Sequence, residues 1–273
     1  MSRRNEILDE MGLAPRWTLR EGLARTRPAA VAGDAAGEPP PDLVAAAIDG
    51  RVSDAVILRE AVPPAGADVQ GRAAAIMQMD WAPLAEAVSG CTGCPLAATR
   101  NCTVFGVGDR KASWLFVGEG PGAEEDARGE PFVGQAGRLL DNMLSALQMR
   151  RGEDVYVANI VKCRPPGNRT PAAAEVAACE PYLHRQIQLL QPRVIVALGK
   201  TAAVTLLGKE QSIASMRGKV FRYQDTPLMV TYHPAYLLRT LPDKIKAWED
   251  LCFIRERVAE WRAGATAEGP AAG

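Results

Sequence analysis

Four of the six cysteines in this 273-residue chain could together form a metal site, although two of them could equally be ordinary buried thiols. Cys91 and Cys94 form a C-x2-C pair, a turn that lets two thiolates face one metal centre. Cys163 and Cys179 lie far along the chain and can complete the ligand set where the fold brings them close. Zinc and an iron–sulfur cluster both accept four thiolates, so the residues alone leave both open.

A second candidate site begins at residues 118–122, Gly-Glu-Gly-Pro-Gly, directly after the apolar run Trp-Leu-Phe-Val. Such a run predicts a buried strand that stops where the backbone needs a positive φ or a close approach to a ligand. Open α/β folds place their sites at turns of this kind, at the carboxyl edge of the sheet. A tight turn without a ligand would use the same glycines, so this segment is not decisive by itself.

Three further side chains are placed for chemistry. His233 precedes a proline after the last expected strand, and Asn159 lies at the end of an earlier strand. An amide can act as donor and acceptor to one ligand edge. Phe132, beside Pro131 and Gly134, is either a stacking surface or a core residue. The strand ends carrying Glu119, Asn159 and His233 should meet at one edge of the sheet, whereas His184 lies within a long helical pattern and is expected to have no direct role.

The elements that must position these residues alternate along the chain. Apolar runs are followed by helical patterns, which predicts a three-layer α/β/α fold around a mostly parallel, four-stranded sheet. Thr170 and Pro171 suit the N-cap and first position of the long helix. The expected strands are residues 113–117, 155–161, 194–198 and a pair around 220–223 and 228–232, and the expected helices are residues 137–147, 171–190, 201–207 and 244–261.

Composition divides the chain into four parts. Residues 1–26 have the pattern of a helical arm, which could dock on the main domain or bind a protein partner. Residues 27–80 are rich in Ala, Pro and Gly and are expected to be a disordered linker. Residues 81–263 are expected to form the functional domain, and residues 264–273 a disordered tail.

Charge and hydropathy exclude some classes of protein. The formal net charge is zero, so only the excess of Lys and Arg in residues 161–240 suggests a basic surface. No run is long and apolar enough for a membrane span, and the N-terminus lacks the apolar segment of a secretion signal. We therefore expect a cytoplasmic protein whose cysteines serve as metal ligands, catalytic groups or buried thiols rather than disulfides. We also expect it to be a monomer. Cys102 and Cys252 are surplus, and either could be the fourth ligand.

Five motifs in this order resemble the family 4 uracil-DNA glycosylases, the iron–sulfur branch of the uracil-DNA glycosylase superfamily. The resemblance runs from about Cys91 to Arg239 and does not cover residues 1–80. The motifs are Cys91-x2-Cys94, Val-Gly118-Glu-Gly-Pro-Gly122, Pro-Phe132-Val-Gly-x-Ala-Gly137, Asn159-Ile-Val-Lys-Cys-Arg-Pro-Pro166 and His233-Pro-Ala-Tyr-Leu-Leu-Arg239.

The resemblance implies hydrolysis of the N-glycosidic bond of deoxyuridine in DNA by a nucleoid-associated repair enzyme. It implies that Phe132 stacks on the extruded uracil, Asn159 bonds its pyrimidine edge and His233 lies near its O2 atom. Further implied roles are a [4Fe-4S] cluster on Cys91, Cys94, Cys163 and Cys179, a deoxyribose side lined by Gly118, Glu119 and Gly120, and a duplex-entering loop with Leu238 and Arg239.

The chain departs from related branches at two places. The best-known branch carries an Asp after its first Gly-Gln, whereas here Glu119 and Glu125 are the candidates for activating water. A related iron–sulfur branch that bonds covalently to DNA has a basic insert with a nucleophilic His. The loop at residues 164–171 is short and has no His, so ordinary turnover is expected.

Three other functions compete with uracil excision. A redox or DNA-tethering protein would use the cluster and leave His233 and Asn159 without a role. A phosphate-binding module is disfavoured because both the P-loop Lys-Ser/Thr and the G-x-G-x-x-G pattern are missing. A glycosylase for another damaged base would use the same residues.

Overall fold

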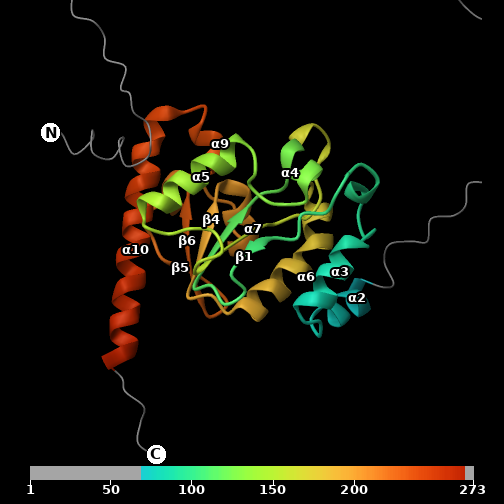
Figure 1. Ribbon diagram of the computed structural model, residues 1–273, viewed down its shortest axis with the longest axis horizontal. Helices are drawn as coiled ribbons and strands as arrows, with labels where there is room; N and C mark the ends of the chain where they lie inside the picture. Colours follow the sequence, from blue (N-terminus) through green and yellow to red (C-terminus); the bar gives the residue numbers. More distant parts are fainter. Residues whose placement is uncertain (1–68, 268–273) are drawn as a thin grey trace, which may run out of the picture. The chain divides into compact units, whose positions relative to one another are not determined.

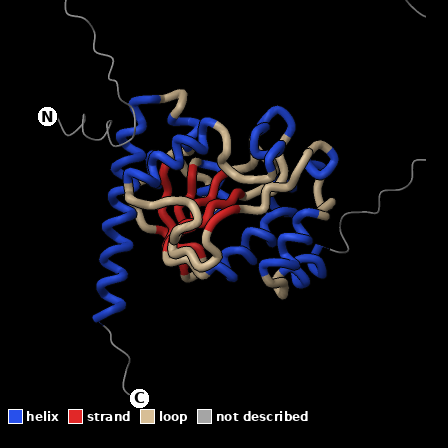
Figure 2. The backbone as a smooth tube through the Cα atoms, viewed as in Figure 1, coloured by secondary structure: helices blue, strands red, loops and turns tan. Residues whose placement is uncertain are grey.

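The structure, a computed structural model, describes residues 69–267, with side chains from residue 71 to residue 263. A six-stranded sheet in the order β1-β3-β2-β4-β6-β5 lies at its centre, with helices on both sides (Figures 1 and 2). The strands are β1 (Val107–Gly108), β2 (Trp114–Gly118), β3 (Val155–Asn159), β4 (Val194–Leu198), β5 (Phe221–Tyr223) and β6 (Thr226–Thr231).

The helices form the two outer layers. The longer ones are α2 (Val69–Ile76), α3 (Trp81–Ser89), α5 (Gln135–Ala146), α6 (Ala173–Leu190), α7 (Lys200–Leu207) and α10 (Lys244–Ala267). The shorter ones are η1 (Pro95–Ala98), α4 (Ala123–Arg128), η2 (Pro166–Asn168), α8 (Ile213–Met216), α9 (Pro234–Leu237) and η3 (Leu241–Asp243). In Figure 1, α5, α9 and α10 lie on one side of the sheet, and α2, α3 and α6 lie on the other.

The four central strands β3, β2, β4 and β6 are parallel, and β1 and β5 pair antiparallel at the two edges. Every residue of β2, β3 and β4 is buried, as expected for parallel strands covered by helices on both faces. The predicted three-layer fold with a parallel, four-stranded centre is therefore confirmed. The two-residue strand β1 was not predicted, because Val107 and Gly108 form too short an apolar run.

The core follows the alternation of side chains along each strand. In β2, Trp114 and Phe116 pack in a cluster with residues of α5 and α10, whereas Leu115 and Val117 pack in a cluster with residues of α6 and α7. The side chains of this one short strand thus pack against both helical layers. This rigid centre holds the end of β2, where the glycine turn begins.

The topology places a cleft where the glycine turn lies. Strand β2 lies between β3 and β4, so the chain leaves β2 for one neighbour and later returns to the other. Open α/β sheets bind ligands outside the carboxyl ends of the strands at such a switch point. The hydroxyl of Thr201, which follows β4, donates a hydrogen bond to the carboxylate of Glu119, which follows β2, across this point.

Several predicted boundaries differ from the structure, and two of them have a clear physical reason. Helix α2 lies inside the predicted linker 27–80, because Ile76 is buried and Arg72 donates a hydrogen bond to the carbonyl of Ala178 in α6. Helix α6 begins at Ala173, not at Pro171. The reason is that the carboxylate of Glu175 accepts the backbone N–H of Ala172 at 2.7 Å and caps the helix there.

The remaining predicted segments lie largely beyond the described chain. The arm at 1–26 and the linker as far as residue 68 are outside the described residues. Helix α10 continues past the predicted domain end at residue 263 to Ala267. In residues 69–267, no helix has the length and apolarity required to cross a bilayer.

Candidate active site and cysteine site

A cavity of about 380 Å³ opens at the carboxyl ends of the central strands, and we call it the base cavity. The strand ends carrying Glu119, Asn159 and His233 meet in it, as the strand order required. Its lining residues are Glu119, Gly120, Pro121, Gly122, Glu125, Phe132, Ala136, Asn159, Pro165, Asn168, Arg169, His233, Ala235, Tyr236 and Arg239. Most of the residues singled out from the sequence therefore share one concave site.

Asn159 ends β3 and is 2% exposed. Its Oδ1 atom is buried and has no hydrogen-bond partner among the described residues. Its backbone carbonyl accepts a hydrogen bond of 2.9 Å from the buried ammonium of Lys162. A buried acceptor without a donor costs about 1–3 kcal/mol, so this atom favours a ligand that brings an N–H group into the cavity.

Phe132 and His233 form one wall of the base cavity. Their rings are stacked, with centroids 5.5 Å apart and planes inclined by 29°. Gly118 makes this arrangement possible, because a Cβ atom there would lie 2.6 Å from the Phe132 ring and 2.5 Å from Asn159 Oδ1. Gly118 thus contributes to the site because it has no side chain, although it does not line the cavity itself.

His233 is held as a neutral ring with a defined tautomer. Burial, assisted by the nearby charge of Arg239 and opposed by Glu125, lowers the pKa of His233 to about 4. Its Nδ1 atom accepts the backbone N–H of Ala235 at 3.1 Å, which caps α9. Since a neutral imidazole has one N–H group, the proton is on Nε2, which is left as a donor.

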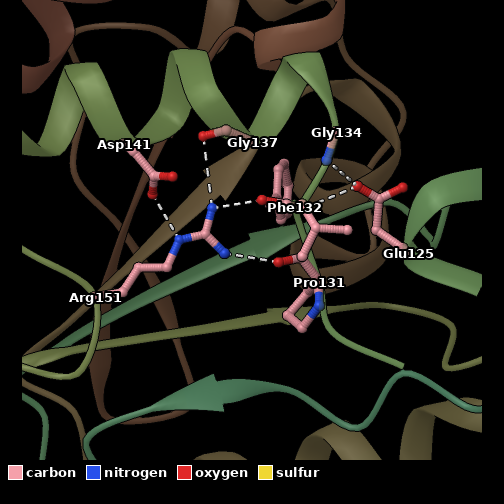
Figure 3. A network of polar contacts seen from close by, with 8 residues as sticks. Glu125, Pro131, Phe132, Gly134, Gly137, Asp141 and Arg151 are labelled. Carbon is pink, nitrogen blue, oxygen red and sulfur yellow. Dashed lines mark hydrogen bonds and ion pairs between the residues drawn. The ribbon is translucent and has the colours of Figure 1, made fainter. Parts of the chain in front are cut away.

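The two candidate carboxylates have different surroundings. Glu119 accepts one hydrogen bond from the Thr201 hydroxyl. Glu125 accepts three backbone N–H groups, from Gly122 at 3.0 Å, Val133 at 2.9 Å and Gly134 at 3.1 Å. The Glu125 carboxylate therefore ties the glycine turn to the segment that carries Phe132, and it has few lone pairs left for a water. Figure 3 shows its contact with Gly134 in that segment.

The segment after His233 faces solvent at the rim of the base cavity. Arg239 lines the cavity, and Leu238 is 38% exposed, whereas Leu237 is fully buried in the core. The hydroxyl of Tyr236 donates a hydrogen bond of 2.6 Å to Asp243 and so fixes the two ends of this segment. An exposed leucine on a fixed loop is suited to contact with an apolar partner surface.

The four cysteines of the predicted ligand set lie on the face of the sheet that packs against α6 and α7, in what we call the cysteine site. Cys163 and Cys179 are in the core there, with Cys91 and Cys94 packed against it. Burial raises the pKa of the Cys163 thiol; Arg100 lowers it, and the neighbouring Cys94 and Cys91 raise it further. Cys252 packs in the cluster on the opposite face, which excludes it from this group.

The cysteine site offers thiol donors, which both a single zinc and an iron–sulfur cluster accept. In the described residues, no group of three or more His, Cys, Asp or Glu side chains is placed to hold a metal ion. A single zinc needs all its ligand atoms within about 2.3 Å of one point. A cluster is larger, because each thiolate binds a different iron, and hydrogen bonds to the sulfurs are part of such sites.

Such N–H donors are present at three of the sulfurs. Arg72 donates to Cys91 at 3.4 Å, Arg100 donates to Cys163 at 3.1 Å, and the backbone N–H of Lys162 donates to Cys179 at 3.3 Å. Four neighbouring thiols, three of which have N–H groups directed at the sulfur, fit a thiolate-bound cluster.

Sequence reasoning missed several residues of the two sites. Arg72 was assigned to the linker, and Arg100 had no recognisable signal. Asn168 and Arg169 line the base cavity, and Arg169 forms an ion pair of 2.7 Å with Glu175. Their loop directly follows Cys163, which is the signal that could have identified them.

Comparison with known proteins agrees with this arrangement. Residues 105–252 match the family model of the uracil DNA glycosylase superfamily. The type-4 uracil-DNA glycosylase of Thermotoga maritima is 47% identical over 165 residues, which cover 60% of this chain and 85% of that protein. That of Pyrobaculum aerophilum is 46% identical over 169 residues, covering 59% and 86%. A type-5 enzyme of the same organism is 32% identical over 146 residues, covering 48% and 64%.

Proposed function

Since this chain belongs to the type-4 branch of the uracil DNA glycosylase superfamily, we propose that it removes uracil from DNA. It flips deoxyuridine out of the strand and hydrolyses the N-glycosidic bond, leaving an abasic site for base excision repair. The observation that carries this proposal is the buried, unpartnered Oδ1 of Asn159 in the wall of the base cavity.

Asn159 supplies the discrimination between uracil and cytosine. Uracil presents an N3–H donor, which Oδ1 accepts, and an O4 acceptor for the amide group of the same side chain. Cytosine presents an acceptor at N3 and a donor at the 4-position, so both contacts would face like groups. Leaving buried polar groups unpaired in this way can give strong selectivity.

His233 and Phe132 act on the same base from the adjoining wall. Phe132 stacks on the flipped uracil and offsets part of the lost stacking in the duplex. The N–H at Nε2 of His233 donates to uracil O2, where negative charge develops as the glycosidic bond breaks. A preorganised donor of this kind typically contributes ~3 kcal/mol to catalysis.

Glu119 is the carboxylate that we assign to the sugar side. Breaking the bond leaves positive charge on the deoxyribose, as in other glycoside cleavages. The Glu119 carboxylate, oriented by the Thr201 hydroxyl, stabilises that charge and orients the attacking water. Glu125 belongs to the candidate catalytic set because it lines the cavity, and its three amide hydrogen bonds support a role in holding the loop.

We assign contact with the DNA duplex to the residues at the rim of the base cavity. Leu238 enters the stack where the base has left, and Arg239 contacts the phosphate backbone beside it. Uracil-containing DNA is the partner that this rim supports. The monomeric state, the cytoplasmic and nucleoid location and the partner-binding role of residues 1–26 stay predictions.

We also propose that Cys91, Cys94, Cys163 and Cys179 hold a [4Fe-4S] cluster. These residues would let a bound cluster cross-link the segment after α3, the loop after β3 and helix α6. Arg72 and Arg100 stabilise the thiolates through their N–H groups. The cross-links at these cysteines would thus hold the loop after β3, which lines the base cavity, in a fixed position.

The test is release of the base from oligonucleotides with one deoxyuridine, deoxycytidine, thymidine or deoxyinosine. We expect an alkali-labile site at deoxyuridine and little cleavage of the other three. Release of hypoxanthine or thymine at a similar rate would favour a glycosylase for another damaged base. Binding without any base release would favour the DNA-tethering alternative and overturn the proposed function.

A further inference from the structure

The backbone of Phe132 is in an uncommon conformation. Its φ angle is 56°, in the left-handed region that bulky residues rarely adopt. Strain of this kind persists only where the surrounding structure imposes it, and it is concentrated at functional sites. The contacts that hold this peptide therefore decide where the Phe132 ring lies.

Arg151, which precedes β3 and lies outside the base cavity, contacts the carbonyl groups of this segment (Figure 3). Its Nη1 and Nη2 atoms donate to the carbonyls of Pro131 and Phe132, both at 2.6 Å. Its Nε atom donates to Asp141 in α5 at 2.6 Å, which orients the guanidinium. The Arg151 side chain is 16% exposed, and only a planar fork of donors can reach three acceptors at once.

The other side of the same segment is held by an anion and by close packing. The Glu125 carboxylate accepts the backbone N–H groups of Val133 and Gly134 (Figure 3). Gly137 allows α5 to approach, because a Cβ atom there would lie 1.7 Å from the Phe132 carbonyl oxygen. A cation on the carbonyls and a carboxylate on the amides thus fix the chain on both sides of Phe132.

We propose that Arg151 is a positioning residue that holds the Phe132 ring against His233, ready to stack on the extruded base. The effect on catalysis rests on the proposed function, whereas the effect on the ring does not. Arg151 does not line the base cavity, so its effect on the base passes through the segment that carries Phe132.

The ring position can be measured without any activity. The chain has two histidines, and a His184→Gln variant assigns the ring protons of His233 in the NMR spectrum. Those protons lie beside the Phe132 ring and carry its ring-current shift. We expect Arg151→Ala to move them toward their positions in Phe132→Ala, and Arg151→Lys to move them less.

The matched control is Arg150→Ala. Arg150 is the residue before Arg151, and its side chain forms an exposed ion pair with Glu153. This variant should leave the His233 signals and uracil release unchanged. Unmoved His233 signals in both Arg151 variants would overturn the proposal. If Arg151→Ala fails to fold, the Arg151→Lys spectrum decides in its place.

Kinetics provide the second readout. We expect Arg151→Ala to lower single-turnover uracil release about tenfold in the wild-type background and to have little further effect in Phe132→Ala. An equal loss in both backgrounds would mean that Arg151 acts on the whole fold and would overturn the proposal. If the wild type releases no uracil, the proposed function fails, and the NMR comparison still tests the role of Arg151.

Discussion

The base cavity and the cysteine site treat their polar atoms in opposite ways. At the cysteine site, N–H donors are directed at the sulfurs of Cys91, Cys163 and Cys179. In the base cavity, the buried Oδ1 of Asn159 has no donor within the described residues. Satisfied groups suit a cofactor that stays, and an open acceptor suits a ligand that enters and leaves.

The two sites nevertheless share one short segment of chain. Lys162 joins them, because its ammonium donates to the carbonyl of Asn159 while its backbone N–H donates to Cys179. Burial lowers the pKa of Lys162 to about 8, and the neighbouring Cys179 opposes this shift. Substitutions in the base cavity, in the cysteine site and at Lys162 itself therefore test whether a change in one site affects the other.

The largest expected effect is at His233. His233→Ala removes the donor to uracil O2 and should lower single-turnover release by about 10²–10³-fold. Iron content should change little, because the cysteine site is untouched, whereas the loss of the α9 cap and of the ring stacked on Phe132 should lower the thermal stability. His184→Ala, the matched control, should keep full activity, and a similar loss in both variants would contradict the role given to His233.

The next effect should appear at the cysteine site, as a loss of stability. Cys179→Ser should reduce iron and sulfide content and lower the unfolding temperature by about 10 °C, because a bound metal centre contributes folding free energy. Cys252→Ser is the control, since Cys252 packs on the opposite face. A Cys179 variant that keeps its iron would remove this residue from the ligand set.

A smaller effect is expected where the sites meet. Lys162→Met removes the donor to the Asn159 carbonyl and to Gln186 Oε1, which lies 2.6 Å from the ammonium. The unpaired acceptors should shift Asn159 and weaken uracil release about tenfold, with iron content retained. Lys111→Met, on the surface, is the control and should release uracil at the wild-type rate. Unchanged uracil release by Lys162→Met would contradict the coupling of the two sites through Lys162.

The smallest effect concerns pH. Because burial lowers the pKa of His233 to about 4, the ring stays neutral and uracil release should not depend on its titration between pH 5 and 8. Protonation disfavours the native state, so stability from this group is lost as pH falls from its ordinary value near 6.5 through 4. An NMR titration of the His233 ring with a midpoint above 6 would contradict the buried, neutral donor.

The sequence predicted the positions of Glu119, Asn159 and His233 because strand order alone sends their chain segments to one edge of the sheet. It could not predict the left-handed Phe132 or its contact with Arg151, since these depend on side-chain geometry between distant segments. Helix α2 was missed for a related reason, because its Ala-rich sequence resembles a linker until Ile76 is buried.

The most direct test of the base cavity is single-turnover uracil release by Asn159→Ala, compared with Asn142→Ala on the exposed surface of α5. We expect Asn159→Ala to lose at least 100-fold in rate while it keeps its iron and its affinity for undamaged DNA. Asn142→Ala should equal the wild type. Full uracil release by Asn159→Ala would contradict the claim that its open acceptor recognises the base.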